Sequence, residues 1–165
     1  MPGEGLDAEW VRSWWEQVDA TLARLTRSFL SAHGFPPGHN AVTLATHDSR
    51  RATDALVDLT PIPSDLATLY WVISEAALPD VDSGYFIHSP ATAAEHLREY
   101  GPAAIGGESI ALVFASDGGG HLFAIGDSGQ VWKSTTASWL DDFEVATASL
   151  QEFLEQLGQR IAKQL

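Results

Sequence analysis

Apolar residues recur at two different spacings along the chain, and each spacing predicts a different kind of element. Spacings of three and four predict an amphipathic helix over Leu6–His33, whose apolar positions are Val11, Trp14, Trp15, Val18, Leu22, Leu25 and Phe29. Asp7 suits the N-cap of this helix, and Gly34 suits the residue just past its end. The same spacing predicts a closing helix that runs from a capping box at Ser149–Glu152 to near Gln164.

Three tryptophans stand close together in the first predicted helix. Trp14 falls on the apolar face with Val11 and Val18, which favours a place in the core over a platform for a ligand. Trp10 is the tryptophan that we expect to be partly exposed.

Short apolar runs separated by glycine-rich turns predict a β-meander in the second half of the chain. Ile110–Ala115 and Leu122–Ile125 flank the turn Ser116–Gly120, and Gln130–Lys133 follows a second turn at Asp127–Gly129. Runs of this length, rich in β-branched and aromatic residues, are typical of strands buried on at least one face. We therefore expect three antiparallel strands, whose core is supplied by Leu112, Phe114, Phe123, Ile125 and Val131.

The remaining segments predict further helices and short extended pieces. Helices are expected over Ser49–Leu59, over Pro63–Ala76, and after Ser89-Pro90 as far as Tyr100. Tyr85–Ile87 is a predicted strand that could join the meander. Ala41–Ala45 is either a strand or an extended connector, and Trp139–Val145 is either irregular chain or a short edge strand.

Helices before and after a small antiparallel sheet make the predicted fold α+β, with amphipathic helices at both ends of the chain. The 165 residues, 45% of them hydrophobic, are enough for a single domain over residues 1–165.

Charge and composition narrow the range of partners. Nine basic and 22 acidic residues give a net charge of −13, which repels nucleic-acid phosphates and favours a basic partner. The chain has no cysteine, which excludes disulfides and thiolate metal sites. No apolar run approaches the ~20 residues of a membrane span, and the chain does not start with a recognisable signal peptide. We therefore expect a cytoplasmic protein without membrane contact.

The segments around the meander also carry a family resemblance. Val113–Gly120, Leu122–Ile125 and Gly129–Trp132 resemble the central hairpin of the SUKH superfamily. Ile62–Tyr70 resembles the proline-started helix of that superfamily, and Ser149–Leu154 resembles its closing helix.

This resemblance covers Ala52–Leu157 and implies a function. The SUKH superfamily contains many bacterial toxin-immunity proteins and a yeast cell-wall-synthesis regulator. By resemblance, the chain would be a non-catalytic immunity or regulatory module that neutralises a toxin partner by masking its surface. One alternative is a stand-alone scaffold protein without a toxin partner.

Several polar residues near the meander resemble parts of catalytic sites, but each lacks a necessary companion. Asp117 and Asp127 stand at opposite ends of a strand about 17 Å long, too far apart to act on one bond as glycosidase carboxylates do. Asp117 and His121 supply two possible metal ligands, whereas a zinc site needs three or four. Gly118–Gly120 precedes a strand and has no lysine near it in the sequence, unlike a phosphate-binding loop. We expect no metal, no cofactor and no catalysis; the alternative is a small hydrolase that uses Asp117 and His121.

The predicted binding surface centres on the turn between the first two strands of the meander. This turn, here called the glycine loop, consists of Ser116, Asp117, Gly118, Gly119, Gly120 and His121. A tight turn at a sheet end offers backbone donors on a rigid base. Nearby aromatic residues would supply anchor area, because aromatic side chains dominate many interfaces. The candidates are Tyr85, Trp132 and Trp139.

Trp132 alternates with Val131, so it is expected on the sheet face opposite Val131. A basic partner would be attracted by acidic residues that include Asp141, Asp142 and Glu144. The alternative is that Trp132 packs under a loop and the glycines only turn the chain.

Overall fold

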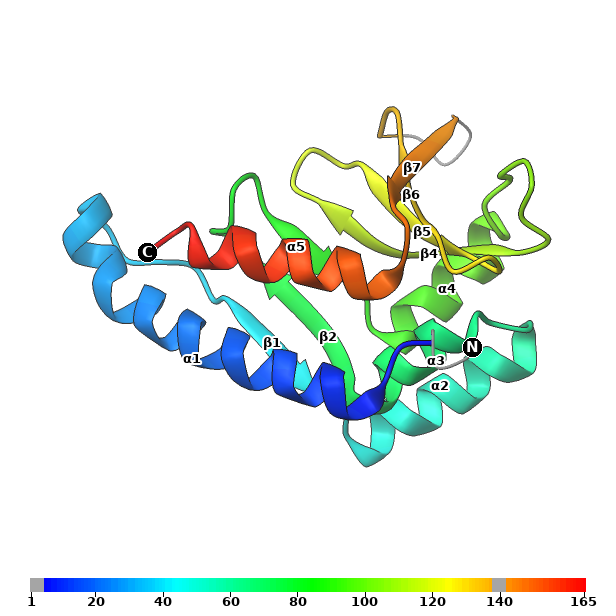
Figure 1. The fold of residues 1–165 in the computed structure, drawn as a ribbon, viewed down its shortest axis with the longest axis horizontal. Coiled ribbons are helices and arrows are strands. Elements are labelled where there is room, and N and C mark those ends of the chain that lie inside the picture. Colours follow the sequence, from blue (N-terminus) through cyan, green and yellow to red (C-terminus); the bar gives the residue numbers. More distant parts are fainter. Residues whose placement is uncertain (1–4, 138–141) are drawn as a thin grey trace.

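Seven strands lie in sequence order across one antiparallel sheet in the described part of the chain (Figure 1). The computed structural model describes residues 5–137 and 142–165. The strands are β1 (Ala41–Leu44), β2 (Ile73–Leu78), β3 (Tyr85–Ile87), β4 (Ala111–Asp117), β5 (Leu122–Gly126), β6 (Val131–Ser134) and β7 (Phe143–Thr147). The helices are α1 (Ala8–His33), α2 (His47–Leu59), α3 (Ser64–Val72), α4 (Pro90–Tyr100) and α5 (Leu150–Ala162). The predicted α+β fold is confirmed.

The first and last helices lie side by side against one face of the sheet (Figure 1). Each buries the apolar stripe that its spacing predicts, and Gly34 ends α1 with a φ of 79°. Trp14 joins the two helices, because its indole Nε1 donates a hydrogen bond of 2.7 Å to the carbonyl oxygen of Leu154. Trp14 is therefore a core residue, and Trp10 is half-exposed, as predicted.

The predicted meander core is also confirmed. All five predicted residues are at most 5% exposed: Leu112, Phe114, Phe123, Ile125 and Val131. A β-bulge interrupts the β4–β5 register between Val113 and Ala115. A bulge inserts one extra residue into a strand. That extra residue is Phe114, which is fully buried with its ring centroid 5.5 Å from that of Phe153 on α5.

The opposite face of the meander is covered by the chain between α4 and β4. A second apolar cluster there contains Ala111, Val113, Leu122 and Ala124, against which Ala103 and Ile105 pack. The Glu108 carboxylate pins this covering segment, because it accepts hydrogen bonds from the Ser128 backbone, the Ser128 hydroxyl and the Trp132 indole. Burial raises the pKa of Glu108, but these hydrogen bonds outweigh burial and hold the pKa below its ordinary value.

One predicted boundary is wrong. The helix expected over Pro63–Ala76 ends at Val72, and the following residues form β2, which pairs with both β1 and β3. Ser74 to Ala77 suit a helix by propensity, but pairing on two sides and burial of Ala76 and Leu78 favour the strand. The two segments for which the sequence allowed either a strand or irregular chain both contribute strands, namely β1 and β7. The predicted strand Tyr85–Ile87 joins the sheet as β3.

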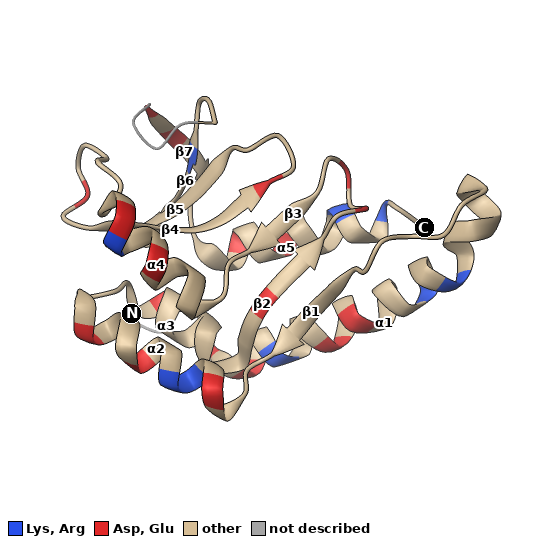
Figure 2. Ribbon diagram, turned by 180° about the vertical axis from the view of Figure 1, so that it is seen from behind, with Lys and Arg blue, Asp and Glu red and all other residues tan. Residues whose placement is uncertain are grey.

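Charged residues lie mainly on the helices and loops, whereas the strands carry few of them (Figure 2). Among the described residues, no helix combines the length and the apolar character that a bilayer crossing requires.

Candidate functional site

The glycine loop is held in shape by the side chain of Asp117. Its carboxylate Oδ1 accepts hydrogen bonds from the backbone nitrogens of Gly119, at 3.0 Å, and of His121, at 2.9 Å. The Asp117 side chain is only 7% exposed, while Gly118, Gly119 and Gly120 are exposed. Asp117 therefore has the turn role that the sequence predicts.

The loop is also fastened to the neighbouring β2–β3 turn. Gly118 donates its backbone N–H to the Gly84 carbonyl oxygen at 3.0 Å, and Asp117 pairs with Tyr85 across β3 and β4. A Cβ atom on Gly118 would overlap the Ser83 carbonyl oxygen, so this close approach requires glycine. The structure thus brings Tyr85 beside the glycine loop.

Trp132 does not join this surface. It lies on the sheet face opposite Val131, as predicted, but there it is half-buried and its indole bonds to Glu108 in the covering segment. Tyr85, in contrast, packs against the main core, on the sheet face opposite to that of Trp132. This arrangement matches the alternative in which Trp132 packs under a loop. Trp139 and Asp141 lie outside the described residues; Asp142 and Glu144 are exposed.

The possible catalytic pairs have separate surroundings. Asp127 accepts a hydrogen bond from the Ser109 hydroxyl at 2.7 Å, whereas the side chain of Asp117 bonds to Gly119 and His121. His121 Nδ1 lies 3.3 Å from both carboxylate oxygens of Asp117. Lys133, which is distant in sequence, places its Nζ 3.8 Å from the same carboxylate. No group of three or more histidine, aspartate or glutamate side chains in the described ranges is arranged to hold a metal ion.

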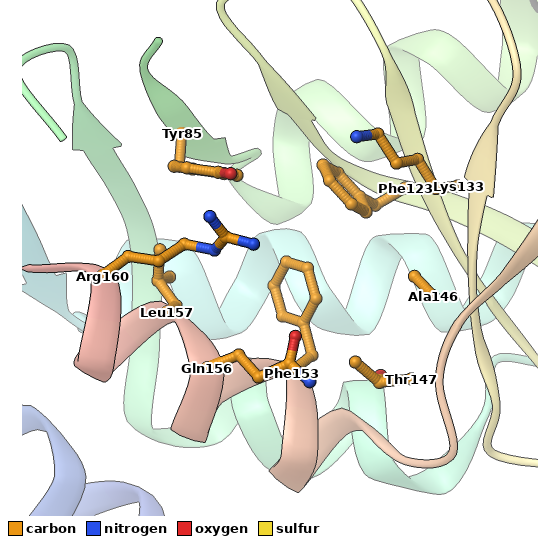
Figure 3. Close-up of a pocket in the computed structure, with 9 residues that line it drawn as sticks. All are labelled: Tyr85, Phe123, Lys133, Ala146, Thr147, Phe153, Gln156, Leu157 and Arg160. Carbon is orange, nitrogen blue, oxygen red and sulfur yellow. The ribbon is translucent and has the colours of Figure 1, made fainter. Parts of the chain in front are cut away.

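A cleft that sequence reasoning missed opens beside the glycine loop, between the sheet and α5 (Figure 3). We call it the aromatic cleft. Its volume is about 210 Å³, and its lining consists of Tyr85, Phe123, Lys133, Ala146, Thr147, Phe153, Gln156, Leu157 and Arg160. No sequence pattern indicates the cleft, because Tyr85 and Arg160 meet only after α5 packs on the sheet.

Two cations and three aromatic rings give the cleft its character. The Phe123 and Phe153 ring centroids are 5.2 Å apart, in an edge-to-face arrangement. The Arg160 guanidinium carbon lies 5.5 Å from the Tyr85 ring centroid, and Lys133 Nζ lies 5.7 Å from that of Phe123. Burial raises the pKa of Tyr85; Arg160 opposes this effect, and Asp82 and Asp117 add to it.

A serine–histidine pair lies on β4 and at the end of β3. His88 Nε2 is 2.9 Å from the Ser116 hydroxyl oxygen, and the buried His88 Nδ1 has no hydrogen-bond partner among the described residues. Burial, and secondly the charge of His96, lower the pKa of His88 to about 4. A histidine with this pKa is a weak base, so the pair lacks both the orienting carboxylate and the basicity of a catalytic triad.

His88 makes the fold sensitive to acid. In the unfolded chain the pKa of His88 returns to about 6.5. Between pH 6.5 and 4 the unfolded state therefore binds a proton at His88 that the folded state does not bind. The stabilisation present above pH 6.5 is therefore lost as the pH falls toward 4, by about 3 kcal/mol. Urea titrations at pH 7.5, 5.5 and 4.5 measure this loss.

The matched variants are His88→Gln and His39→Gln, since His39 is exposed. In His88→Gln the free energy of unfolding is expected to fall less between pH 6.5 and 4 than in the parent, whereas in His39→Gln it is expected to fall as in the parent. An unchanged decline in His88→Gln would show that another group is responsible.

Comparison with protein-family models and with curated proteins gives no match for this chain. The resemblance to the SUKH superfamily therefore stays a prediction.

Proposed function

We propose that the protein is a non-catalytic binding module that masks the surface of a basic protein partner, such as a toxin domain, in the manner of SUKH-type immunity and regulatory proteins. The proposed binding surface is the glycine loop with Tyr85. The proposal includes a cytoplasmic location, with which a chain free of cysteine is compatible.

The observation that carries the proposal is the exposed but fixed backbone of the glycine loop. Three consecutive exposed glycines are held by Asp117 on one side and by Gly84 on the other. A partner would lose little conformational freedom in binding a loop that is already ordered. The net charge of −13 supports a basic partner, which the acidic field would attract over a long range.

The environment of Asp117 supports binding over hydrolysis. Its Oδ1 accepts two backbone N–H bonds, and the carboxylate also faces His121 and Lys133. A carboxylate that already accepts these hydrogen bonds is poorly placed to take a proton from a substrate or a water.

The test measures binding to the proteins encoded beside this gene, each purified and titrated by interferometry. At least one is expected to bind with a Kd below about 1 μM, with an association rate that falls as salt rises. Gly119→Lys is expected to weaken this binding about 100-fold, because it places a bulky cation in the interface with a basic partner.

Gly106→Lys is the matched control. It adds the same charge at an exposed glycine on the covering segment, where a Cβ meets no atom within 4 Å, so binding is expected to change by less than about threefold. Equal losses in both variants would overturn the proposed surface. Turnover of generic ester, phosphate or glycoside substrates that disappears in Asp117→Asn would overturn the proposed function.

A further inference from the structure

The lining of the aromatic cleft carries two cations and no carboxylate among the described residues. This is unusual for the chain, in which 22 acidic residues outnumber nine basic ones. The cations come from separate elements, Lys133 from β6 and Arg160 from α5. Figure 3 shows the Arg160 guanidinium reaching toward the space between the rings of Tyr85 and Phe153, with Lys133 beside Phe123.

Both cations keep hydrogen-bond donors available for a ligand. Lys133 Nζ is 3.8 Å from the Asp117 carboxylate, which is longer than a hydrogen bond. Arg160 Nη1 donates to Asp82 at 3.1 Å. Among the described residues, its guanidinium makes no other hydrogen bond, although it has five N–H donors. The two side chains are 36% and 45% exposed, so a ligand can reach them from solvent.

The apolar part of the cleft is fixed by the core. Phe123, Phe153 and Leu157 line the cleft but are only 5%, 8% and 2% exposed, so their neighbours hold them in place. These rings are already ordered, which lowers the cost of binding a flat apolar group against the part of them that the cleft leaves open.

We propose that the aromatic cleft binds a small monocarboxylate with a single aromatic ring. The ring packs against Phe123, Phe153 and Tyr85, while the carboxylate accepts hydrogen bonds from Arg160 and Lys133. A monoanion is favoured over a phosphate, because Asp82 and Asp117 already balance part of the cationic charge and the whole chain repels multiple negative charge. The volume of about 210 Å³ is below the usual range for drug-sized ligands and suits one ring with a short acidic arm.

This site goes beyond the proposed function, because it needs no protein partner and its lining shares only Tyr85 with the proposed binding surface. The two proposals therefore fail separately: loss of partner binding in Gly119→Lys says nothing about the cleft.

Phenylacetate is the probe, titrated into the isotope-labelled full chain and followed by changes in amide chemical shifts. Saturable shifts are expected at Tyr85, Phe123, Lys133 and Arg160, with a Kd of about 1 mM. Phenylacetamide has the same shape without the charge, and it is expected to bind at least about tenfold more weakly. This comparison uses the parent protein alone, so it does not depend on how any variant folds.

Three variants locate the anion site. Arg160→Gln and Lys133→Gln are each expected to weaken phenylacetate binding by about tenfold. Lys163→Gln removes the same charge from an exposed position just past α5, outside the cleft, and is expected to change binding by less than about twofold.

The proposal is overturned if phenylacetate gives no saturable shifts, or if Lys163→Gln weakens phenylacetate binding as much as Arg160→Gln does. It is also overturned if inorganic phosphate binds the parent as tightly as phenylacetate does, since the aromatic rings would then contribute nothing to binding. Binding of the tripeptide Gly-Gly-Phe through its C-terminal carboxylate, without binding of phenylacetate, would replace the small ligand with a peptide end.

Discussion

Replacing Trp14 with alanine is expected to lower the free energy of unfolding by about 4 kcal/mol. The indole is 6% exposed, packs between α1 and α5, and makes the 2.7 Å hydrogen bond to the Leu154 carbonyl oxygen. The substitution therefore removes buried apolar contacts and one hydrogen bond between the first and last helices. Urea unfolding followed by far-ultraviolet circular dichroism measures the change.

Trp10→Ala is the control on the same helix. Trp10 is half-exposed and packs only at the margin of the core, so its loss is expected to cost about 1 kcal/mol. Equal losses in the two variants would mean that α1 is not anchored through Trp14.

Gly118→Ala is expected to lower the free energy of unfolding by about 3 kcal/mol. The new methyl group would overlap the carbonyl oxygen of Ser83, and a backbone atom cannot rotate aside as a side chain can. The glycine loop and the β2–β3 turn would have to separate, which breaks the hydrogen bond from Gly118 to Gly84. Thermal and urea unfolding report the loss.

Gly119→Ala is the neighbouring control. A Cβ there would lie 3.4 Å from the Asp117 carboxylate and the His121 ring, which is ordinary contact, so a change of less than about 1 kcal/mol is expected. If Gly118→Ala proved as stable as Gly119→Ala, the two turns would not be packed as closely as described.

The parts of the fold that the sequence predicted are those with strong local causes. The meander follows from glycine turns between apolar runs. Helix α4 follows from Ser89, whose hydroxyl caps the helix by accepting a hydrogen bond from the Thr92 backbone, and from Pro90 in its first turn. The boundary between α3 and β2 had no such local cause. Ser74 to Ala77 favour a helix by themselves, and only pairing with strands from elsewhere in the chain makes them part of a sheet.

In the candidate site, too, the features with local causes could be predicted and those that depend on tertiary packing could not. Asp117 was predicted as a turn residue, because its partners lie within four positions of it. The aromatic cleft could not be predicted, since its cations lie 27 residues apart and reach one space only when α5 packs on the sheet. For Trp132 the prediction was correct in part. Strand alternation predicts the sheet face on which Trp132 lies, but it does not predict the covering segment that packs over Trp132 on that face.

The order of the strands has a consequence for folding during synthesis. Each strand pairs with the next one made, so the sheet can grow as the chain leaves the ribosome. In contrast, Trp14 meets Leu154 across 140 residues. At roughly 5–20 residues per second, α1 waits on the order of ten seconds for α5. During that interval part of its apolar stripe is open to chaperones, and the core closes only when α5 emerges.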